Sequence, residues 1–68
     1  MSPEQFEALA QLMRLRQSPN REALRLVLVD GANQSEAAAK TGIPRTNVTR
    51  QAGSARRVID LARKLTRS

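Results

Sequence analysis

Four side chains with hydrogen-bonding groups lie close together in the middle of the chain, just after Pro44. They are Thr46, Asn47, Thr49 and Arg50. Such side chains can bind the edges of DNA bases, and an arginine can give two hydrogen bonds to one guanine. We therefore expect these four residues to read base pairs, with Arg50 as the strongest candidate, provided that the chain displays them on one exposed helix.

The stretch from Gln34 to Gly53 can display them in that way, because its spacing is typical of a helix-turn-helix. Gln34, Ala38, Gly42 and Val48 stand at the offsets that this motif uses. Ala38 is small, which lets the second helix cross close to its Cβ atom. Gly42 suits the turn between the helices, where we expect a positive φ that other residues adopt only with a steric penalty.

Two apolar residues, Ile43 and Val48, are expected to pack the two helices of the motif together. Pro44 fits the opening of the second helix, and the polar residues that follow then fall on its other faces. A helix that is held on one side and polar on the other is the major-groove reader of this motif. The alternative is an ordinary helical hairpin whose polar face is only hydrated.

The distribution of charge favours DNA over the hydrated hairpin. The formal net charge is +6, and residues 1–44 contribute nothing to it, because their five basic and five acidic side chains cancel. Residues 45–68 carry seven basic side chains against Asp60 alone. A polyanionic partner explains why the whole excess begins at the second helix of the motif. A basic tail kept for solubility explains it less well, because the same segment contains the reader helix.

Five further residues are expected to hold DNA phosphates. Gln34 and Ser35 stand at the start of the motif's first helix, where free N–H groups and a partial positive charge attract anions. Arg45, Arg56 and Arg57 add positive charge along the second helix. For Gln34 and Ser35 the alternative is that they only start the helix.

The composition argues against an enzyme and against a metal site. The chain has no cysteine and no histidine, so the usual nucleophiles, bases and zinc ligands are missing. There are no paired carboxylates and no glycine-rich phosphate loop, and we expect no catalytic residue, metal, cofactor or small-molecule ligand. No apolar run approaches the length of a membrane span or a signal peptide, which predicts a cytoplasmic protein with no membrane partner.

The pattern of helix signals predicts an all-α fold, a small bundle of four to five helices. Serine followed by proline marks two helix starts, and Asn33 with Glu36 has the spacing of a capping box. The expected helices run from Pro3 to Arg16 or Gln17, from Asn20 to Val29, from Gln34 to Thr41, and onward from Pro44 or Arg45.

Apolar residues at helical spacing predict which faces form the core. In the first helix these are Phe6, Leu9, Ala10, Met13 and, at the edge, Leu12; in the second they are Leu24, Val27 and Leu28, with Leu26 and Val29 widening the face. In the last helix, Gly53 and Ser54 have low helix propensity, and Ser54 could cap a separate fifth helix. The apolar stripe keeps its phase across Gly53, which favours one long helix.

The small size of the chain predicts a homodimer. Sixty-eight residues form one helix-turn-helix domain with a small core, and a partner subunit is the remaining source of stability. The C-terminal helix, about residues 54–66, is the expected dimerisation element, because its apolar residues exceed what three short helices can cover. The alternative is that these residues fold back on the first helix of their own chain. The expected interface consists of Val58, Ile59, Leu61, Ala62 and Leu65.

The stretch VLVDGANQSEAAAKTGIPRTNVTRQA, from Val27 to Ala52, resembles the KorA/TrfB family of plasmid transcriptional repressors. The shared features are an apolar run that ends in Val29-Asp30-Gly31, the alanine and glycine of the first motif helix, and Arg45 and Val48 in the second. Weaker similarity in the helical pattern covers most of the chain. The resemblance implies an all-α helix-turn-helix repressor that binds a palindromic operator as a homodimer and controls plasmid maintenance or transfer genes, often including its own.

The sequence departs from the longer members of that family in two places. It ends at Ser68, so we expect it to lack their separate C-terminal dimerisation domain. It also has Arg50 where those members carry glutamine in the reader helix, and glutamine reads adenine whereas arginine reads guanine. Neither their mode of dimerisation nor their operator sequence therefore carries over to this chain, which looks most like the small repressors of conjugative plasmids.

The leading hypothesis from the sequence is a dimeric, sequence-specific repressor of transcription that acts on double-stranded DNA by occluding a promoter. A second hypothesis is the DNA-binding module of a recombinase or sigma-like factor. The helix start directly at Met1-Ser2 and the lack of a catalytic region argue against such a fragment. A third, from a different class, is a helical adaptor whose basic face binds an acidic protein.

Overall fold

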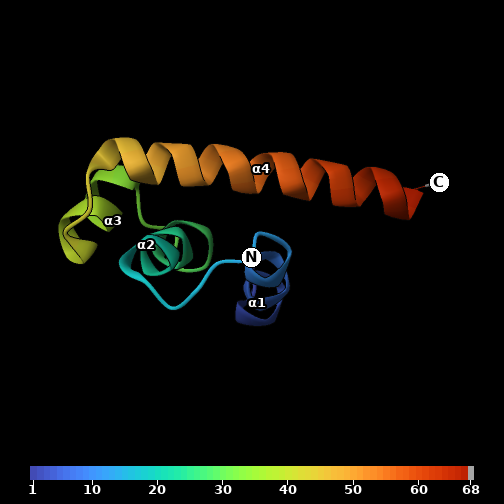
Figure 1. Ribbon diagram of the computed structural model, residues 1–68, viewed down its shortest axis with the longest axis horizontal. Helices are drawn as coiled ribbons and strands as arrows, with labels where there is room; N and C mark the ends of the chain where they lie inside the picture. Colours follow the sequence, from blue (N-terminus) through green and yellow to red (C-terminus); the bar gives the residue numbers. More distant parts are fainter. Residues whose placement is uncertain (68) are drawn as a thin grey trace.

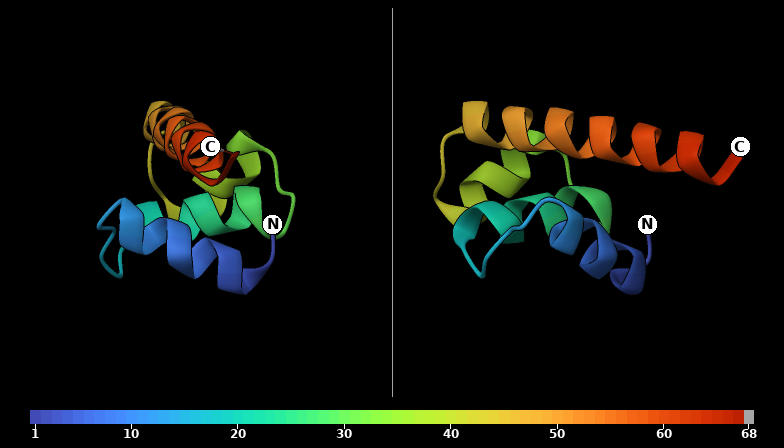
Figure 2. Two further views of the ribbon diagram at one scale, coloured as in Figure 1. Left: turned by 90° about the vertical axis from the view of Figure 1, so that its right-hand side faces the viewer. Right: turned by 45° about the vertical axis from the view of Figure 1, so that its right-hand side comes forward.

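The computed structural model describes residues 1–67, and every regular element in that part of the chain is an α-helix. The helices are α1 (Pro3–Leu12), α2 (Pro19–Leu28), α3 (Gln34–Thr41) and α4 (Arg45–Arg67). The all-α fold predicted from the sequence is confirmed. The three short helices lie on one side of α4, which extends past them, and the molecule measures 40 × 20 × 19 Å (Figures 1 and 2).

The two serine-proline pairs start α1 and α2 as expected. At α1, the backbone N–H of Gln5 donates to Ser2 Oγ at 3.1 Å, and the backbone N–H of Ser2 donates to Gln5 Oε1 at 2.9 Å. This reciprocal pair is a complete capping box, which satisfies two N–H groups that a helix leaves open at its start. At α2, Ser18 Oγ accepts from the backbone N–H of Arg21 at 3.3 Å.

The start of α3 forms only half of the expected capping box. Asn33 Oδ1 accepts from the backbone N–H of Glu36 at 2.8 Å. The Glu36 carboxylate does not return to the backbone of Asn33; it accepts instead from the side-chain amide Nδ2 of Asn33 at 2.7 Å. The helix nevertheless spans Gln34–Thr41, as predicted.

The first helix is shorter than predicted, because it ends at Leu12 and not at Arg16 or Gln17. Arg14 adopts a left-handed conformation with φ 55. Its N–H donates to Gln11 O at 3.1 Å, and the N–H of Leu15 donates to Ala10 O at 2.9 Å. These two bonds form the Schellman arrangement that closes a helix, which is usually completed by glycine. The early end turns Leu15 back onto the core.

One buried cluster joins α1, α2 and α4. Met13 is half-buried at its edge, and Leu12 is 65 % exposed, so Leu12 does not belong to the core. Val58 and Ile59 of α4 are half-buried and pack against the same cluster. Its fully buried members are Phe6, Leu9, Ala10, Leu24 and Ala55.

A second cluster joins α2, α3 and α4, and consists of Ala23, Leu26, Ala37 and Val48. The second helix contributes to both clusters, which confirms that it is buried on more than one side. Val27 and Leu28, expected to point inward, are only half-buried at the cluster edges. Leu24, also expected inward, is fully buried, and the other deep positions of α2 are Leu26 and Ala23, of which Ala23 was not expected.

The last helix is continuous. It runs from Arg45 to Arg67 through Gly53 and Ser54, so no fifth helix begins there. Its N-terminal half lies across α2 and α3, and its C-terminal half passes α1 and projects beyond it (Figure 1). One straight element therefore connects the helix-turn-helix with the far end of the molecule.

Candidate nucleic-acid interface

The helices α3 and α4 form the helix-turn-helix that the sequence predicts. Gly42 ends α3 with φ 76, and its N–H donates to Ala38 O at 2.8 Å, so the turn uses the left-handed conformation that glycine tolerates best. Pro44 O accepts from the N–H groups of Asn47 at 3.0 Å and Val48 at 3.4 Å, which starts α4. The turn is thereby fixed from both helices.

Apolar contacts hold the two helices of the motif together. Val48 is fully buried in the cluster between α2, α3 and α4, and Ile43 packs at its edge as expected. The tightest alanine of α3 is Ala37, which is fully buried, whereas Ala38 is half-buried. From the sequence, we expected the second helix of the motif to cross closest to Ala38. Three consecutive alanines have the same side chain, so their residue type does not show which of them lies at the contact.

The four predicted base-reading residues differ in exposure. Thr46, Thr49 and Arg50 are exposed, whereas Asn47 is half-buried. Thr46 and Arg50 are four residues apart and share one outward face of α4, opposite the buried Val48. Asn47 lies at the edge of this outward face and is the least accessible of the four residues.

One hydrogen bond connects a predicted base reader with a predicted phosphate ligand. The hydroxyl of Thr49 donates to Gln34 Oε1 at 2.6 Å, across the junction between α4 and the start of α3. With its oxygen bound in this way, the side-chain amide of Gln34 keeps its N–H donors for another acceptor. The bond thus positions Gln34 from the reader helix, which no sequence pattern indicated.

The predicted phosphate ligands on α3 and α4 are accessible to solvent to different degrees, with Gln34 half-buried and the others exposed. Ser35 is exposed in the first turn of α3, and Arg45 is exposed at the start of α4. Arg56 and Arg57 are also exposed, about three turns further along α4. Arg56 borders a hollow together with Gln34, and Arg57 borders a neighbouring hollow together with Arg50. The structure therefore brings three of the predicted phosphate ligands, together with the predicted base reader Arg50, to two adjoining hollows.

The arginines of α2 differ from those of α4, because they form ion pairs within the chain. Arg21 binds Glu7 and stands over the ring of Phe6, at 5.9 Å from its centroid. Arg25 binds Glu22 and also Asp30, the latter at 3.3 Å. The hydrogen bond from Arg25 lowers the pKa of Glu22 below its ordinary value and raises the pKa of Arg25.

The ion pairs within residues 1–67 include none of the arginines that we assign to DNA, namely Arg45, Arg50, Arg56 and Arg57. Their charge is not neutralised within the described chain. An exposed row of such arginines on one helix creates the positive potential that attracts a polyanion.

The family model KORA, described as TrfB plasmid transcriptional repressor, matches residues 1–66 of the chain. The chain belongs to this family. Comparisons with curated proteins and with solved structures found no match. The match confirms the resemblance seen in the sequence and extends it beyond Val27–Ala52 to nearly the whole chain. DNA binding, transcriptional repression and a plasmid context follow from membership in the TrfB family, whose members are generally not enzymes.

The C-terminal half of α4 carries the five residues predicted to form a dimer interface, and they fall into two groups. Val58, Ile59 and Ala62 are half-buried and line a groove between α4 and α1. Leu61 is 54 % exposed and Leu65 is 78 % exposed. The fold of the chain onto its own first helix thus accounts for the first group but leaves the two leucines in contact with solvent.

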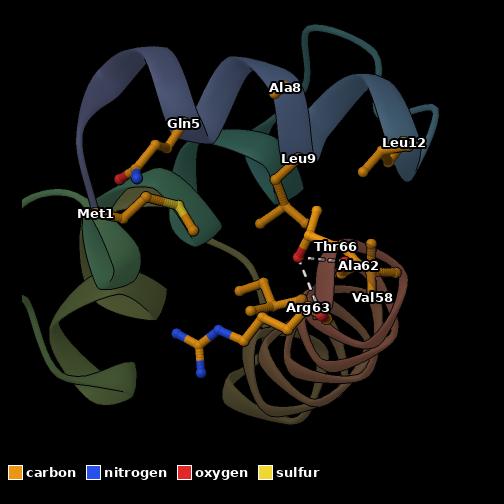
Figure 3. Close-up of a pocket in the computed structure, with 10 residues that line it drawn as sticks. Met1, Gln5, Ala8, Leu9, Leu12, Val58, Ala62, Arg63 and Thr66 are labelled. Atoms are coloured by element: carbon orange, nitrogen blue, oxygen red, sulfur yellow. Dashed lines mark hydrogen bonds between the residues drawn. The ribbon is translucent and has the colours of Figure 1, made fainter. Parts of the chain in front are cut away.

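The groove between α1 and α4 is apolar, and the sequence did not indicate it. Figure 3 shows Leu9 and Leu12 of α1 on one side and Val58 and Ala62 of α4 on the other. Thr66 closes its far end, with a hydroxyl that donates within α4 to Ala62 O and Arg63 O. No helix in residues 1–67 has the length and apolar character needed to cross a membrane.

Proposed function

We propose that the protein is a sequence-specific repressor that binds a palindromic operator in double-stranded DNA as a homodimer. The main support for the proposal is the arrangement of buried and exposed residues in the first turns of α4. Its first turns are held against α2 and α3 by the buried Val48, while Thr46 and Arg50 face outward. An exposed polar face on the second helix of a helix-turn-helix enters the major groove.

Arg50 is the principal base reader in this proposal. It is exposed, carries no ion pair among residues 1–67, and shares its face with Thr46. A guanidinium on that face can donate two hydrogen bonds to one guanine. Asn47 reads bases from the margin of the helix, and Thr49 combines base reading with its bond to Gln34.

Phosphate contacts set the position of the reader helix on the duplex. Gln34 and Ser35 supply them from the start of α3, where the first backbone N–H groups lie outside the hydrogen-bond ladder of the helix. Arg45, Arg56 and Arg57 supply them from α4. The two sets meet beside α4, where Gln34 and Arg56 border one hollow and Arg57 borders the adjoining one.

The dimer forms through the C-terminal half of α4. Leu61 and Leu65 are exposed apolar side chains, and the groove lined by Val58, Ile59 and Ala62 lies beside them. Covering these residues with the same helix of a second subunit removes apolar surface from water. A two-fold axis at this place puts two reader helices into successive major grooves, about 34 Å apart.

Repression follows from occlusion. A dimer that occupies an operator overlapping a promoter excludes RNA polymerase from it, and no cofactor is needed for that effect. The regulated promoters are those of plasmid genes, including the promoter of the repressor's own gene. The protein acts in the cytoplasm, where plasmid DNA is transcribed.

Footprinting on the DNA upstream of its own gene tests this function. The expected result is a protected segment with two-fold symmetry that overlaps the promoter and appears at nanomolar protein concentration in physiological salt. Salt-sensitive binding without a protected segment would contradict the proposal, because any basic helix binds DNA non-specifically. An acidic protein partner would likewise give salt-sensitive binding and no footprint.

A further inference from the structure

Gly53 occupies a position in α4 where the fold does not require a glycine. It lies inside a helix of 23 residues, where glycine is less favourable than any residue except proline. It is exposed, and a Cβ atom placed on it meets no other atom within 4 Å. Its backbone is helical, so it does not serve a left-handed turn as Gly31 and Gly42 do. Alanine would fit here and strengthen the helix.

Side chains with hydrogen-bond donors surround Gly53 on the surface of α4. A hollow on one side of Gly53 is bordered by Gln34, Thr49 and Arg56. The hollow on its other side is bordered by Arg50, Ser54 and Arg57. Amide, hydroxyl and guanidinium groups are the side-chain donors that bind phosphate oxygens in protein–DNA complexes. The glycine therefore lies between the proposed phosphate ligands Gln34 and Arg56 on one side and Arg57 on the other, on the face opposite the buried Ala55.

The position of Gly53 along α4 matches the width of a DNA groove. A helix rises about 1.5 Å per residue, so the eight residues from Arg45 to Gly53 span about 12 Å. The major groove of B-DNA is also about 12 Å wide. If the start of α4 lies at one edge of the major groove, a straight helix reaches the opposite edge at about Gly53. The phosphates of the strand at that edge then lie close to Gly53.

We infer that the sugar-phosphate backbone of one DNA strand crosses α4 directly over Gly53. The missing side chain lets the strand approach the helix backbone, as glycine does wherever a ligand comes close to the main chain. One phosphate then lies in reach of Gln34 and Arg56, and the next in reach of Arg57. Thr49 acts as a positioning residue, because its hydroxyl holds Gln34 Oε1 and leaves the amide N–H groups to donate. The inference rests on the proposed function and adds the place where the operator backbone lies.

The test compares wild type with Gly53→Ala and Gly53→Gln in thermal unfolding and in DNA binding. Both variants should unfold at higher temperature than wild type, because both residues favour the helix and the added atoms meet open space. Affinity should fall about tenfold for Gly53→Ala, on the scale of inserting one carbon into a packed contact, and further for Gly53→Gln. The operator and a random duplex should lose affinity in equal proportion, because no base contact is removed.

The salt dependence of binding separates a steric effect from a change in charge. Gly53→Ala should leave the slope of log affinity against log salt unchanged, whereas Arg56→Ala should lower it by about one unit. Gln11→Ala serves as the control, because Gln11 is an exposed residue of α1 outside both hollows. It should bind both duplexes as wild type does.

The outcomes distinguish this inference from the proposed function. A wild-type protein without a footprint would overturn both. A wild-type footprint together with wild-type affinity in Gly53→Ala would overturn only the inference. So would a lowered unfolding temperature in Gly53→Ala, since the glycine would then serve the fold, or a changed base preference, since Gly53 would then face base edges.

Discussion

The first three helices and α4 differ in how they use the same kinds of residue. In α2, both arginines bind acidic side chains, as Arg21 does with Glu7 of α1. In α4, Arg50, Arg56 and Arg57 are exposed and take part in no ion pair among the described residues. We infer from this comparison that the short helices mainly form a platform, and that α4 carries most of the proposed contacts with other molecules, supplemented by Gln34 and Ser35 of α3.

Large apolar residues follow a similar division, with Leu12 of α1, which is 65 % exposed, as the exception. The large apolar side chain of Leu24 is fully buried in α2, whereas Leu61 and Leu65 of α4 are more than half exposed. A protein this small has little core to spare, so exposed leucines on a long helix are best explained by a second subunit. We expect four substitutions to separate the platform from α4.

The largest effect is expected from Leu61→Glu combined with Leu65→Glu. Both side chains are exposed, so the variant should fold but sediment as a monomer. Its affinity for the full palindrome should fall about a hundredfold, because two linked half-sites gain that much from simultaneous binding. The control is Gln11→Glu combined with Gln17→Glu, which adds the same charge at exposed positions outside α4. A wild type that is monomeric at micromolar concentration would refute the dimer.

Arg50→Ala should have the next largest effect, and only on specific binding. Loss of a two-bond contact with guanine should cost about 1–3 kcal/mol of discrimination between the operator and random DNA. Stability should not change, since Arg50 is exposed and has no ion pair to lose. Titrations on operator and random duplexes measure the difference. Equal losses on both would show that Arg50 holds a phosphate.

Arg56→Ala should weaken binding to all sequences alike. One lost phosphate contact should lower the slope of log affinity against log salt by about one unit. Arg45→Ala provides the comparison at the start of α4 and should behave in the same way. Binding measured at several salt concentrations on two unrelated duplexes decides the matter. If either variant changes which bases are preferred, its arginine contacts a base edge.

The smallest effect is expected from Arg21→Ala, which tests the platform. Loss of the Glu7 pair and of the contact with the Phe6 ring should lower the free energy of unfolding by about 1 kcal/mol. DNA affinity and its salt dependence should stay as in wild type. Arg16→Ala is the control, because Arg16 is exposed in the loop between α1 and α2. It should change neither stability nor DNA binding. A loss of DNA affinity in Arg21→Ala with unchanged stability would contradict the division between platform and α4.

The motif was predictable from the sequence because its determinants are local. Gly42 and Val48 act through the turn and the helices next to them, and the structure places both as expected. The end of α1 was not predictable, because Arg14 adopts a left-handed conformation that sequence patterns assign to glycine. The early end depends on the docking of Leu15 against the core, which is a tertiary contact.

The fine structure of the candidate site also depends on tertiary contacts. The bond between Thr49 and Gln34 joins residues of two helices, and periodicity within one helix gives no sign of it. The hollow that Gln34 borders beside Gly53 also depends on the packing of α3 against α4. In the C-terminal half of α4, the apolar stripe was visible in the sequence, but only the position of α1 separates the half-buried Ile59 from the exposed Leu65.

Selection from random duplexes with wild type and Arg50→Ala in parallel tests the central claim most directly, namely that the exposed face of α4 reads DNA. Wild type should enrich an inverted repeat whose half-site centres lie about one helical turn, or roughly 34 Å, apart. Arg50→Ala should lose one guanine at the symmetric position of each half-site and keep the rest. A wild type that enriches no repeat, or an Arg50→Ala variant that enriches the same repeat with every guanine retained, would contradict the account.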